Sequence, residues 1–217
     1  MPDIPPLIDT DRVPHLAFSP SVKAIQAEKG SRDHYARQPA RLGYQTDTVA
    51  ELAPFLADVD TAFLATASAE GRPYAQHRGG PKGFIRVLDD HTLAFADFAG
   101  NRQYISAGNL AENDRAFLIL IDFATRRRIK LWGHARLVRD DPALVARLKP
   151  EGYRAQADQA ILFHVDAWDI NCPQHIQQKI DAADVTSALA RLEARIAELE
   201  AENATLRTRI SSQGETS

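Results

Sequence analysis

The sequence predicts a mainly β protein of the α+β class, in which an antiparallel β-barrel carries peripheral helices and a C-terminal coiled-coil helix. Two observations predict this class. Short apolar or alternating segments follow one another at hairpin spacing through the middle of the chain, which favours an antiparallel barrel over a parallel sheet. After Asp184, leucine, isoleucine and valine recur in steps of four and three residues, which is the spacing of a coiled coil.

Residues 1–47 are expected to form an N-terminal arm and a helix. The stretch up to about residue 18 is rich in proline and has no periodicity, so an extended arm is expected there. Ser19-Pro20-Ser21 supplies a cap and an early proline for a helix over Val22–Glu28. Thr46 or Asp47 is a second candidate cap, for a helix that ends near Ala57.

Residues 48–180 are expected to form the barrel. The expected strands are Thr61–Ala67, Pro73–Arg78, Phe84–Leu88, Thr92–Phe98, Ala116–Phe123, Arg128–Val138 and Ala160–Ala167. Short polar turns join them where they form hairpins. Before the last strand, Asp141-Pro142 is expected to cap a short helix that ends at Leu148.

Residues 184–211 are predicted to form a dimeric coiled coil. The a positions are Leu189, Ile196, Asn203 and Ile210, and the d positions are Val185, Leu192, Leu199 and Leu206. Such a stripe is also typical of an amphipathic helix that folds back on its own core. Leucine at d and the polar Asn203 at a favour the parallel dimer. The flanking charges of such a dimer are complementary: Arg195 of one copy pairs with Glu200 of the other, and Glu202 pairs with Arg207 in the same way.

Composition excludes several classes of protein. A net charge of −3 over 217 residues argues against a general nucleic-acid binder. Cys172 is the only cysteine, so no intrachain disulfide forms, which suits a reducing cytoplasm. The N-terminus has no signal-peptide pattern, and the most apolar window, Ala116–Ala124, is too short to span a membrane as a helix. A cytoplasmic protein without nucleic-acid or membrane partners is therefore expected.

Two patches predict a phosphate-binding site. The first runs from Gln76 to Gly83, where Arg78 and Lys82 supply cations and glycines let the backbone approach an anion. The second is Asp97-Phe98-Ala99-Gly100-Asn101-Arg102-Gln103, expected to open a helix over Arg102–Leu110 whose free N–H groups favour the same anion. Each patch alone is more typical of turns and solvated charges than of a phosphate site. Their occurrence on strands that are expected to be neighbours favours the site.

The order of elements over Thr61–Val138 resembles the pyridoxamine 5'-phosphate oxidase-like family of FMN-binding split barrels. The resemblance implies a six-stranded antiparallel split β-barrel and a homodimer with FMN at the subunit interface. The residues that it implies for the cofactor are Gln76, His77, Arg78, Gly79 and Lys82 along the flavin, and Asp97, Asn101, Arg102 and Gln103 near its phosphate. The family often has Ser-Arg-Lys where this chain has Asn101-Arg102-Gln103. Further contacts are implied from the opposite subunit, by Arg128, Lys130 and Trp132.

The function that this resemblance implies is an FMN-binding oxidoreductase acting on an unidentified small molecule. The true pyridoxamine phosphate oxidases carry further arginines near the C-terminus, which Asp169–His175 lacks, so vitamin B6 oxidation is not expected. One alternative is a heme-binding or heme-degrading split barrel with His164 or His175 as an axial ligand. Another is a non-catalytic flavin-binding sensor or interaction protein.

No catalytic nucleophile or metal site is predicted from spacing. The chain has no Gly-x-Ser-x-Gly motif. Cys172 and His175 lack the second pair of ligands that a closed zinc site requires. A lone cysteine is more typical of a small buried hydrophobe, and His175 either faces a pocket or caps the helix that follows.

Overall fold

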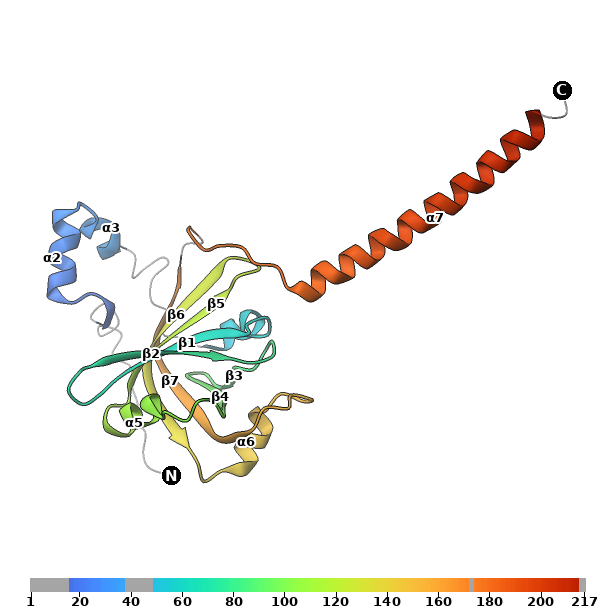
Figure 1. Ribbon diagram of the computed structural model, residues 1–217. Coiled ribbons are helices and arrows are strands. Elements are labelled where there is room, and N and C mark those ends of the chain that lie inside the picture. The colour runs from blue at the N-terminus through green and yellow to red at the C-terminus, as the bar shows by residue number, and fades with distance from the viewer. Residues whose placement is uncertain (1–15, 38–48, 172–173, 215–217) are drawn as a thin grey trace. The chain divides into compact units, whose positions relative to one another are not determined.

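The computed structural model describes residues 16–37, 49–171 and 174–214 (Figure 1). Cys172, the candidate caps Thr46 and Asp47, and the arm up to residue 15 lie outside the described residues. The described residues divide into two compact units. The first contains the chain up to Asp122 and Arg126–Ile176, and the second contains Phe123–Thr125 and the chain from Gln177 onward.

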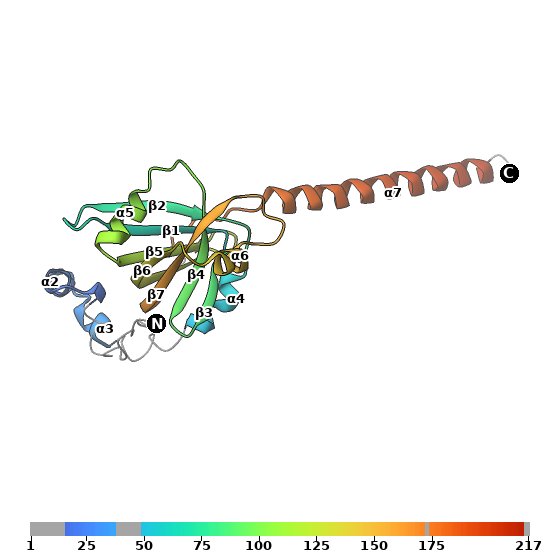
Figure 2. The ribbon, with the colours of Figure 1, turned by 90° about the horizontal axis from the view of Figure 1, so that it is seen from below.

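The first unit is built on one antiparallel sheet of seven strands in the order β2-β1-β5-β6-β7-β4-β3. The strands are β1 Thr61–Ala67, β2 Pro73–Gly79, β3 Arg86–Asp89, β4 Thr92–Phe98, β5 Arg115–Asp122, β6 Arg127–Val138 and β7 Ala157–Asn171. The α+β class is confirmed, but the expected count of six strands is one too low. Arg86–Asp89 pairs with β4 as an additional edge strand, and the sheet stays open because β2 and β3 form its two edges (Figure 2).

The helices are short, except for the last one. They are α2 Pro20–Glu28, α3 Arg32–Arg37, the 3-10 turn η2 Val49–Leu52, α4 Ala53–Leu56, α5 Ile105–Glu112, α6 Pro142–Leu148 and α7 Ala182–Gly214. Two predicted caps are confirmed: Ser19 Oγ accepts from the Val22 amide at 3.3 Å, and Asp141 Oδ1 accepts from the Leu144 amide at 2.8 Å. Among the described helices, none combines the length and the apolar character that crossing a membrane requires.

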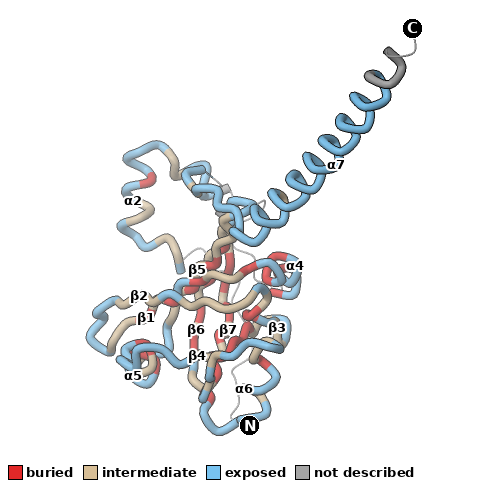
Figure 3. Tube along the Cα trace, turned by 45° about the vertical axis from the view of Figure 1, so that its right-hand side comes forward, coloured by how far each residue is buried: buried red, intermediate tan, exposed pale blue. Residues whose placement is uncertain are grey.

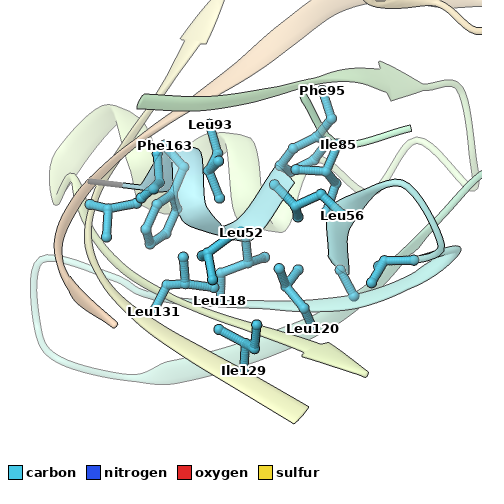
Figure 4. Packing of buried hydrophobic residues seen from close by; sticks show 14 of the residues in the cluster. Leu52, Leu56, Ile85, Leu93, Phe95, Leu118, Leu120, Ile129, Leu131 and Phe163 are labelled. Atoms are coloured by element: carbon cyan, nitrogen blue, oxygen red, sulfur yellow. The ribbon is translucent and has the colours of Figure 1, made fainter. Parts of the chain in front are cut away.

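The core of the first unit lies between the two halves of the curved sheet (Figure 4). Leu118 and Leu120 of β5 form one side with β6, while strands β4 and β7 contribute Leu93 and Phe163 to the other. All four side chains are fully buried. Figure 3 shows that the buried residues concentrate in these strands, whereas α7 has no buried residue up to Ile210. Burial of this apolar area is the main stabilising contribution to the unit.

A bulge between β6 and β7 depends on Gly133. The pairing of the two strands shifts register between Trp132 and Gly133. A Cβ atom added to Gly133 would lie 1.9 Å from the carbonyl oxygen of His164, far inside van der Waals contact. Only glycine therefore allows the two backbones to approach at this point, and the bulge bends the long strand β7 around the core.

Candidate functional site

Two of the predicted cofactor residues form an ion pair across the open side of the sheet. Arg78 lies at the end of β2, Asp97 lies at the end of β4, and Arg78 Nη1 donates to Asp97 Oδ1. The two side chains are only 14% and 13% exposed. The strands β2 and β4 are not neighbours in the sheet, contrary to the expectation. Curvature brings their ends together, so this side-chain pair spans the opening.

The ion pair is the centre of a longer polar network. On one side, Gln76 Oε1 accepts from Arg78 Nη2 at 3.1 Å and from Ser106 Oγ at 3.0 Å. On the other side, Gln159 Nε2 donates to Asp97 Oδ2 at 2.6 Å. Arg139 Nε then donates to Gln159 Oε1 at 3.0 Å. The network therefore fixes the Arg78 guanidinium through two of its nitrogens.

Three members of this network, Ser106, Arg139 and Gln159, were missed by sequence reasoning. Ser106 lies in α5, Gln159 in β7 and Arg139 just after β6. All three are far along the chain from β2, so only the tertiary fold reveals the contacts. Gln159 did carry a signal, because it is a polar residue next to the apolar run of β7. Ser106 is 2% exposed and lies in the first turn of α5, which ties the start of that helix to β2. The first and second sequence patches are thereby brought together.

The second patch differs in local structure from the prediction. The helix begins at Ile105 and not at Arg102, because Arg102 and Tyr104 adopt left-handed φ angles of 59° and 55°. Asn101 Oδ1 accepts from the Gln103 amide at 3.2 Å, which closes a local turn before the helix. Residues 101–104 are exposed. Arg102 makes no hydrogen bond or ion pair with the described residues, so its guanidinium faces solvent.

The glycines of the first patch are explained by packing and turn geometry. A Cβ atom on Gly79 would lie 2.8 Å from His77 Cε1, and one on Gly80 would lie 2.8 Å from Phe84 Cβ. Gly83 has a φ of 77°, in the left-handed region. The local fold therefore explains Gly80 and Gly83 whether or not an anion approaches, whereas at Gly79 the His77 side chain can move aside. Lys82 lies in this turn and is exposed.

The register of the sheet divides the predicted site residues between two faces. Gln76 pairs with Leu64, which pairs with Leu118, and Leu118 pairs with Leu131. Directly opposed residues in antiparallel strands point to the same face, so this row is the inner, core-facing one. His77 belongs to the next row, with Phe63, Ile119 and Lys130, on the outer face. Arg78 is two residues beyond Gln76 and shares its inner face.

The outer face carries the predicted contacts of β6. Arg128, Lys130 and Trp132 alternate with the buried residues Ile129 and Leu131, which confirms the predicted alternation. Lys130 Nζ lies 2.8 Å from Asp169 Oδ2 and 5.3 Å from the centroid of the Trp132 ring. The cation is thus already held by a carboxylate and an aromatic ring.

The outer face is also unusually apolar along β5. Phe117, Ile119 and Ile121 are partly exposed there, while Leu118 and Leu120 between them are buried. The Phe117 and Trp132 rings lie 5.0 Å apart, and Phe63 beside them is 37% exposed. A solvated face of an antiparallel sheet normally carries polar residues.

Three buried polar atoms lack a hydrogen-bond partner among the described residues: Arg78 Nε, Arg128 Nε and Trp168 Nε1. Two of them are guanidinium donors at predicted cofactor positions. Arg78 lies on the inner face and Arg128 on the outer face, so each face has a buried donor without an acceptor. Buried N–H groups are nearly always paired in folded proteins. A ligand rich in acceptor oxygens would satisfy them.

The histidines do not gather into a metal site within the described residues. His134 contacts Asp114 at 3.0 Å and Asp166 at 3.3 Å. The His164 ring lies 6.1 Å from that of His91, and His175 is exposed with a φ of 65°. No group of three His, Cys, Asp or Glu side chains in the described part of the chain could hold a metal ion.

Comparison with known proteins defines the family. The profile of the family described as pyridoxamine 5'-phosphate oxidase matches residues 48–172, more than half of the chain. The chain belongs to this family. No curated protein sequence matches it.

Several solved structures are distantly similar. HupZ of Group A Streptococcus is 16% identical, with 60% of this chain and 98% of that chain covered and a TM-score of 0.46. An FMN-binding protein of Syntrophomonas wolfei is 13% identical, with 70% and 95% covered and a TM-score of 0.45. General Stress Protein 26 of Bacillus anthracis is 15% identical, with 55% and 91% covered and a TM-score of 0.42. Similarity at this level carries no function over to this chain.

Proposed function

We propose that this protein is an FMN-binding flavoprotein, in which two copies of the chain hold FMN between them. Membership in the pyridoxamine 5'-phosphate oxidase family motivates the proposal. One observation carries it: the predicted cofactor residues lie on opposite faces of one sheet. Each face also has a buried guanidinium N–H that has no acceptor among the described residues. One ligand does not reach both faces of a single sheet, so the two groups serve one site only if they come from different copies.

The residues present fit the chemistry of FMN. The phosphate is a dianion, and the exposed Arg102 guanidinium and the backbone amides at the start of α5 are suitable donors for it. Gln76 and Arg78 would lie along the ring system, where the Arg78 Nε–H can donate to a ring oxygen or nitrogen. From the other copy, Lys130 and Trp132 would supply a cation and an aromatic surface.

The partly exposed apolar row on β5 supports a contact between copies of the barrel. Phe117, Ile119 and Ile121 lie on the same face as Arg128 and Lys130, so a second copy that covers this row also meets the proposed flavin contacts. A two-fold interface buries the same patch on both copies.

The proposed activity is that of an oxidoreductase that acts on a small molecule. Bound flavin supplies electron transfer in one- or two-electron steps, and the protein binds it, orients it and tunes its electron affinity. A cation near the reduced ring favours its anionic form, which is the role proposed for Lys130.

The absorption spectrum of the purified protein tests the proposal. We expect a flavin spectrum, and FMN as the compound released on denaturation. FMN is expected rather than FAD because the basic elements suit one terminal phosphate and no Gly-x-Gly-x-x-Gly fingerprint is present. A heme spectrum, or a colourless protein that does not bind added FMN, refutes it. Turnover with NADH or NADPH then separates an enzyme from a flavin-binding sensor.

Arg102→Ala tests where the phosphate lies. Loss of a charge-assisted hydrogen bond worth roughly 1.5 to 3 kcal/mol should weaken FMN binding by about tenfold to a few hundredfold. The fold should survive because Arg102 is exposed. Arg72→Ala is the matched control, because the Arg72 side chain is 82% exposed in the β1–β2 turn and its guanidinium pairs with Glu70. Equal FMN affinities in the two variants would exclude Arg102 from the site.

A further inference from the structure

The second unit contains a long helix whose base is held by the β5–β6 turn. Helix α7 runs over 33 residues, which corresponds to a length of about 50 Å at 1.5 Å per residue. Before it begins, the Lys179 amide donates to the Phe123 carbonyl at 3.2 Å, and Gln178 Nε2 donates to the Ala124 carbonyl at 2.9 Å. The Lys179 ammonium also lies 4.2 Å from the centroid of the Phe123 ring. These contacts lie within the second unit and give the helix a defined start.

The apolar side chains of the heptad are exposed along α7 (Figure 3). Exposed fractions range from 40% to 69% across Val185, Leu189, Leu192, Ile196, Leu199, Leu206 and Ile210. A contiguous apolar row of this length on a helix marks an interaction surface. Helices gain most of their stability from packing of their apolar face, so α7 requires a partner.

We infer that the partner is the same helix of a second copy, packed parallel and in register as a two-stranded coiled coil. Asn203 is the first argument. Its side chain occupies an a position and donates from Nδ2 to the Leu199 carbonyl at 3.1 Å, which leaves the amide oxygen available. In a parallel in-register dimer the two Asn203 amides face each other and can hydrogen-bond. In an antiparallel pair Asn203 instead faces an apolar d residue, which leaves a buried polar group unsatisfied.

The charges beside the seam give the second argument. In a parallel in-register pair, position g of one copy lies beside position e of the other. Arg195 therefore meets the other copy's Glu200, and Glu202 meets the other copy's Arg207. Each contact occurs twice by symmetry. An antiparallel end-to-end alignment brings Arg195 to Glu202 of the other copy but also brings Glu193 to Glu200, so its attraction is offset by repulsion. A parallel shift by one heptad brings Arg195 to Arg207, which is also repulsive. Only the in-register parallel arrangement satisfies these charges together.

The salt bridge that Arg195 makes within its own helix does not compete strongly. Arg195 Nη1 lies 2.9 Å from Glu198 Oε2, with side chains 62% and 67% exposed. Exposed pairs of this kind contribute little, so Arg195 can exchange it for the contact across the seam. This self-complementarity in both polar position and charge identifies a second copy rather than an unrelated helix. The inference is independent of FMN and goes beyond the proposed function.

Disulfide cross-linking of the full-length protein tests the arrangement. In a Cys172→Ser background, Leu199→Cys places one thiol at a d position, where two copies in register come within the Cα separation of about 4.4 to 6.8 Å that a disulfide requires. Ala201→Cys is the matched control, because position 201 is at f, on the outside of the pair. Under mild oxidation we expect covalent dimers to form at least about tenfold faster with Leu199→Cys than with Ala201→Cys.

Equal rates for the two variants, no covalent dimer at either tested d position, or cross-linking of Leu199→Cys without cross-linking of Leu192→Cys would overturn the inference. Residue 199 lies near the middle of α7, so an end-to-end antiparallel pair also brings it close to its own counterpart, but such a pair separates the two copies of residue 192. Leu192→Cys and Ala194→Cys repeat the same d-against-f comparison one heptad earlier, in case Leu199→Cys disturbs the helix. Adding Arg195→Glu to the Leu199→Cys variant should slow its cross-linking, and adding Glu200→Arg as well should restore the rate. Failure of this last change to restore the rate would refute the parallel pairing of charges.

Discussion

The ion pair between Arg78 and Asp97 can be tested by a double-mutant cycle. Arg78 is predicted to serve the cofactor, yet the structure gives its charge a carboxylate partner that is 13% exposed. The cycle compares the free energy of unfolding of the unmodified protein, Arg78→Met, Asp97→Asn and the double variant. Methionine keeps much of the arginine volume without the charge, and asparagine keeps the shape of aspartate.

The expected magnitude follows from burial and from the other contacts of the pair. Two unit charges about 4 Å apart at an effective dielectric constant near 20 attract by roughly 4 kcal/mol, part of which repays their desolvation. Gln76 still accepts from Arg78 after Asp97→Asn, and Gln159 still donates to Asp97 after Arg78→Met. We therefore expect each single substitution to destabilise by about 2 to 3 kcal/mol. The double variant should lose about the same amount, which gives a coupling energy of about 2 kcal/mol.

Urea denaturation of the cofactor-free protein at one fixed protein concentration provides the four free energies. Losses that add within about 0.5 kcal/mol would refute the reasoning, because they would show that the pair contributes no coupling. An FMN titration of the same proteins then separates the two roles of Arg78. If its Nε–H contacts the cofactor, Arg78→Met weakens binding more than Asp97→Asn, which retains the guanidinium.

Further predictions concern the bulge, the coiled coil and the barrel contact. Gly133→Ala should destabilise by about 3 kcal/mol or more, because its Cβ would lie 1.9 Å from the His164 carbonyl oxygen, and thermal unfolding measures the loss. Asn203→Ile should raise the thermal stability of α7 while loosening the choice of oligomer, so that light scattering detects trimers or mixed species. Deleting the chain after Asp184 should leave a dimer that still binds FMN; a monomer with intact binding would mean that one chain holds the whole site.

The strands were predictable because alternation and turn residues are local signals. β1 and β4 begin and end where the sequence predicts, and β6 differs by one residue. The expected count of six strands was wrong because it followed the family resemblance. The seven segments that the sequence itself marks as strands all form strands. The start of α5 was missed because Arg102 and Tyr104 adopt left-handed conformations that their residue types do not favour.

The candidate site was only partly predictable, because its geometry depends on sheet register. Arg78 and Asp97 were both predicted, but their pairing across the open side of the sheet follows from curvature that no local pattern encodes. Gln159 and Ser106 join them through contacts that span 62 and 30 residues of sequence. That Lys130 lies on the opposite face from Arg78 also follows only from the register of β1, β2, β5 and β6.

The two proposed contacts between copies constrain each other through symmetry. A barrel contact that holds FMN and a parallel coiled coil are both two-fold interfaces, each using one patch on both copies. If each chain uses the same second copy for both contacts, the assembly closes as a dimer. If it uses different copies, each chain has two partners, and assembly continues to a tetramer or a longer chain. The mass of the full-length protein, compared with that of the chain ending at Asp184, therefore distinguishes the two cases. Equal numbers of subunits mean that α7 joins the copies that already share FMN, whereas a larger number in the full-length protein means that α7 links separate barrel dimers.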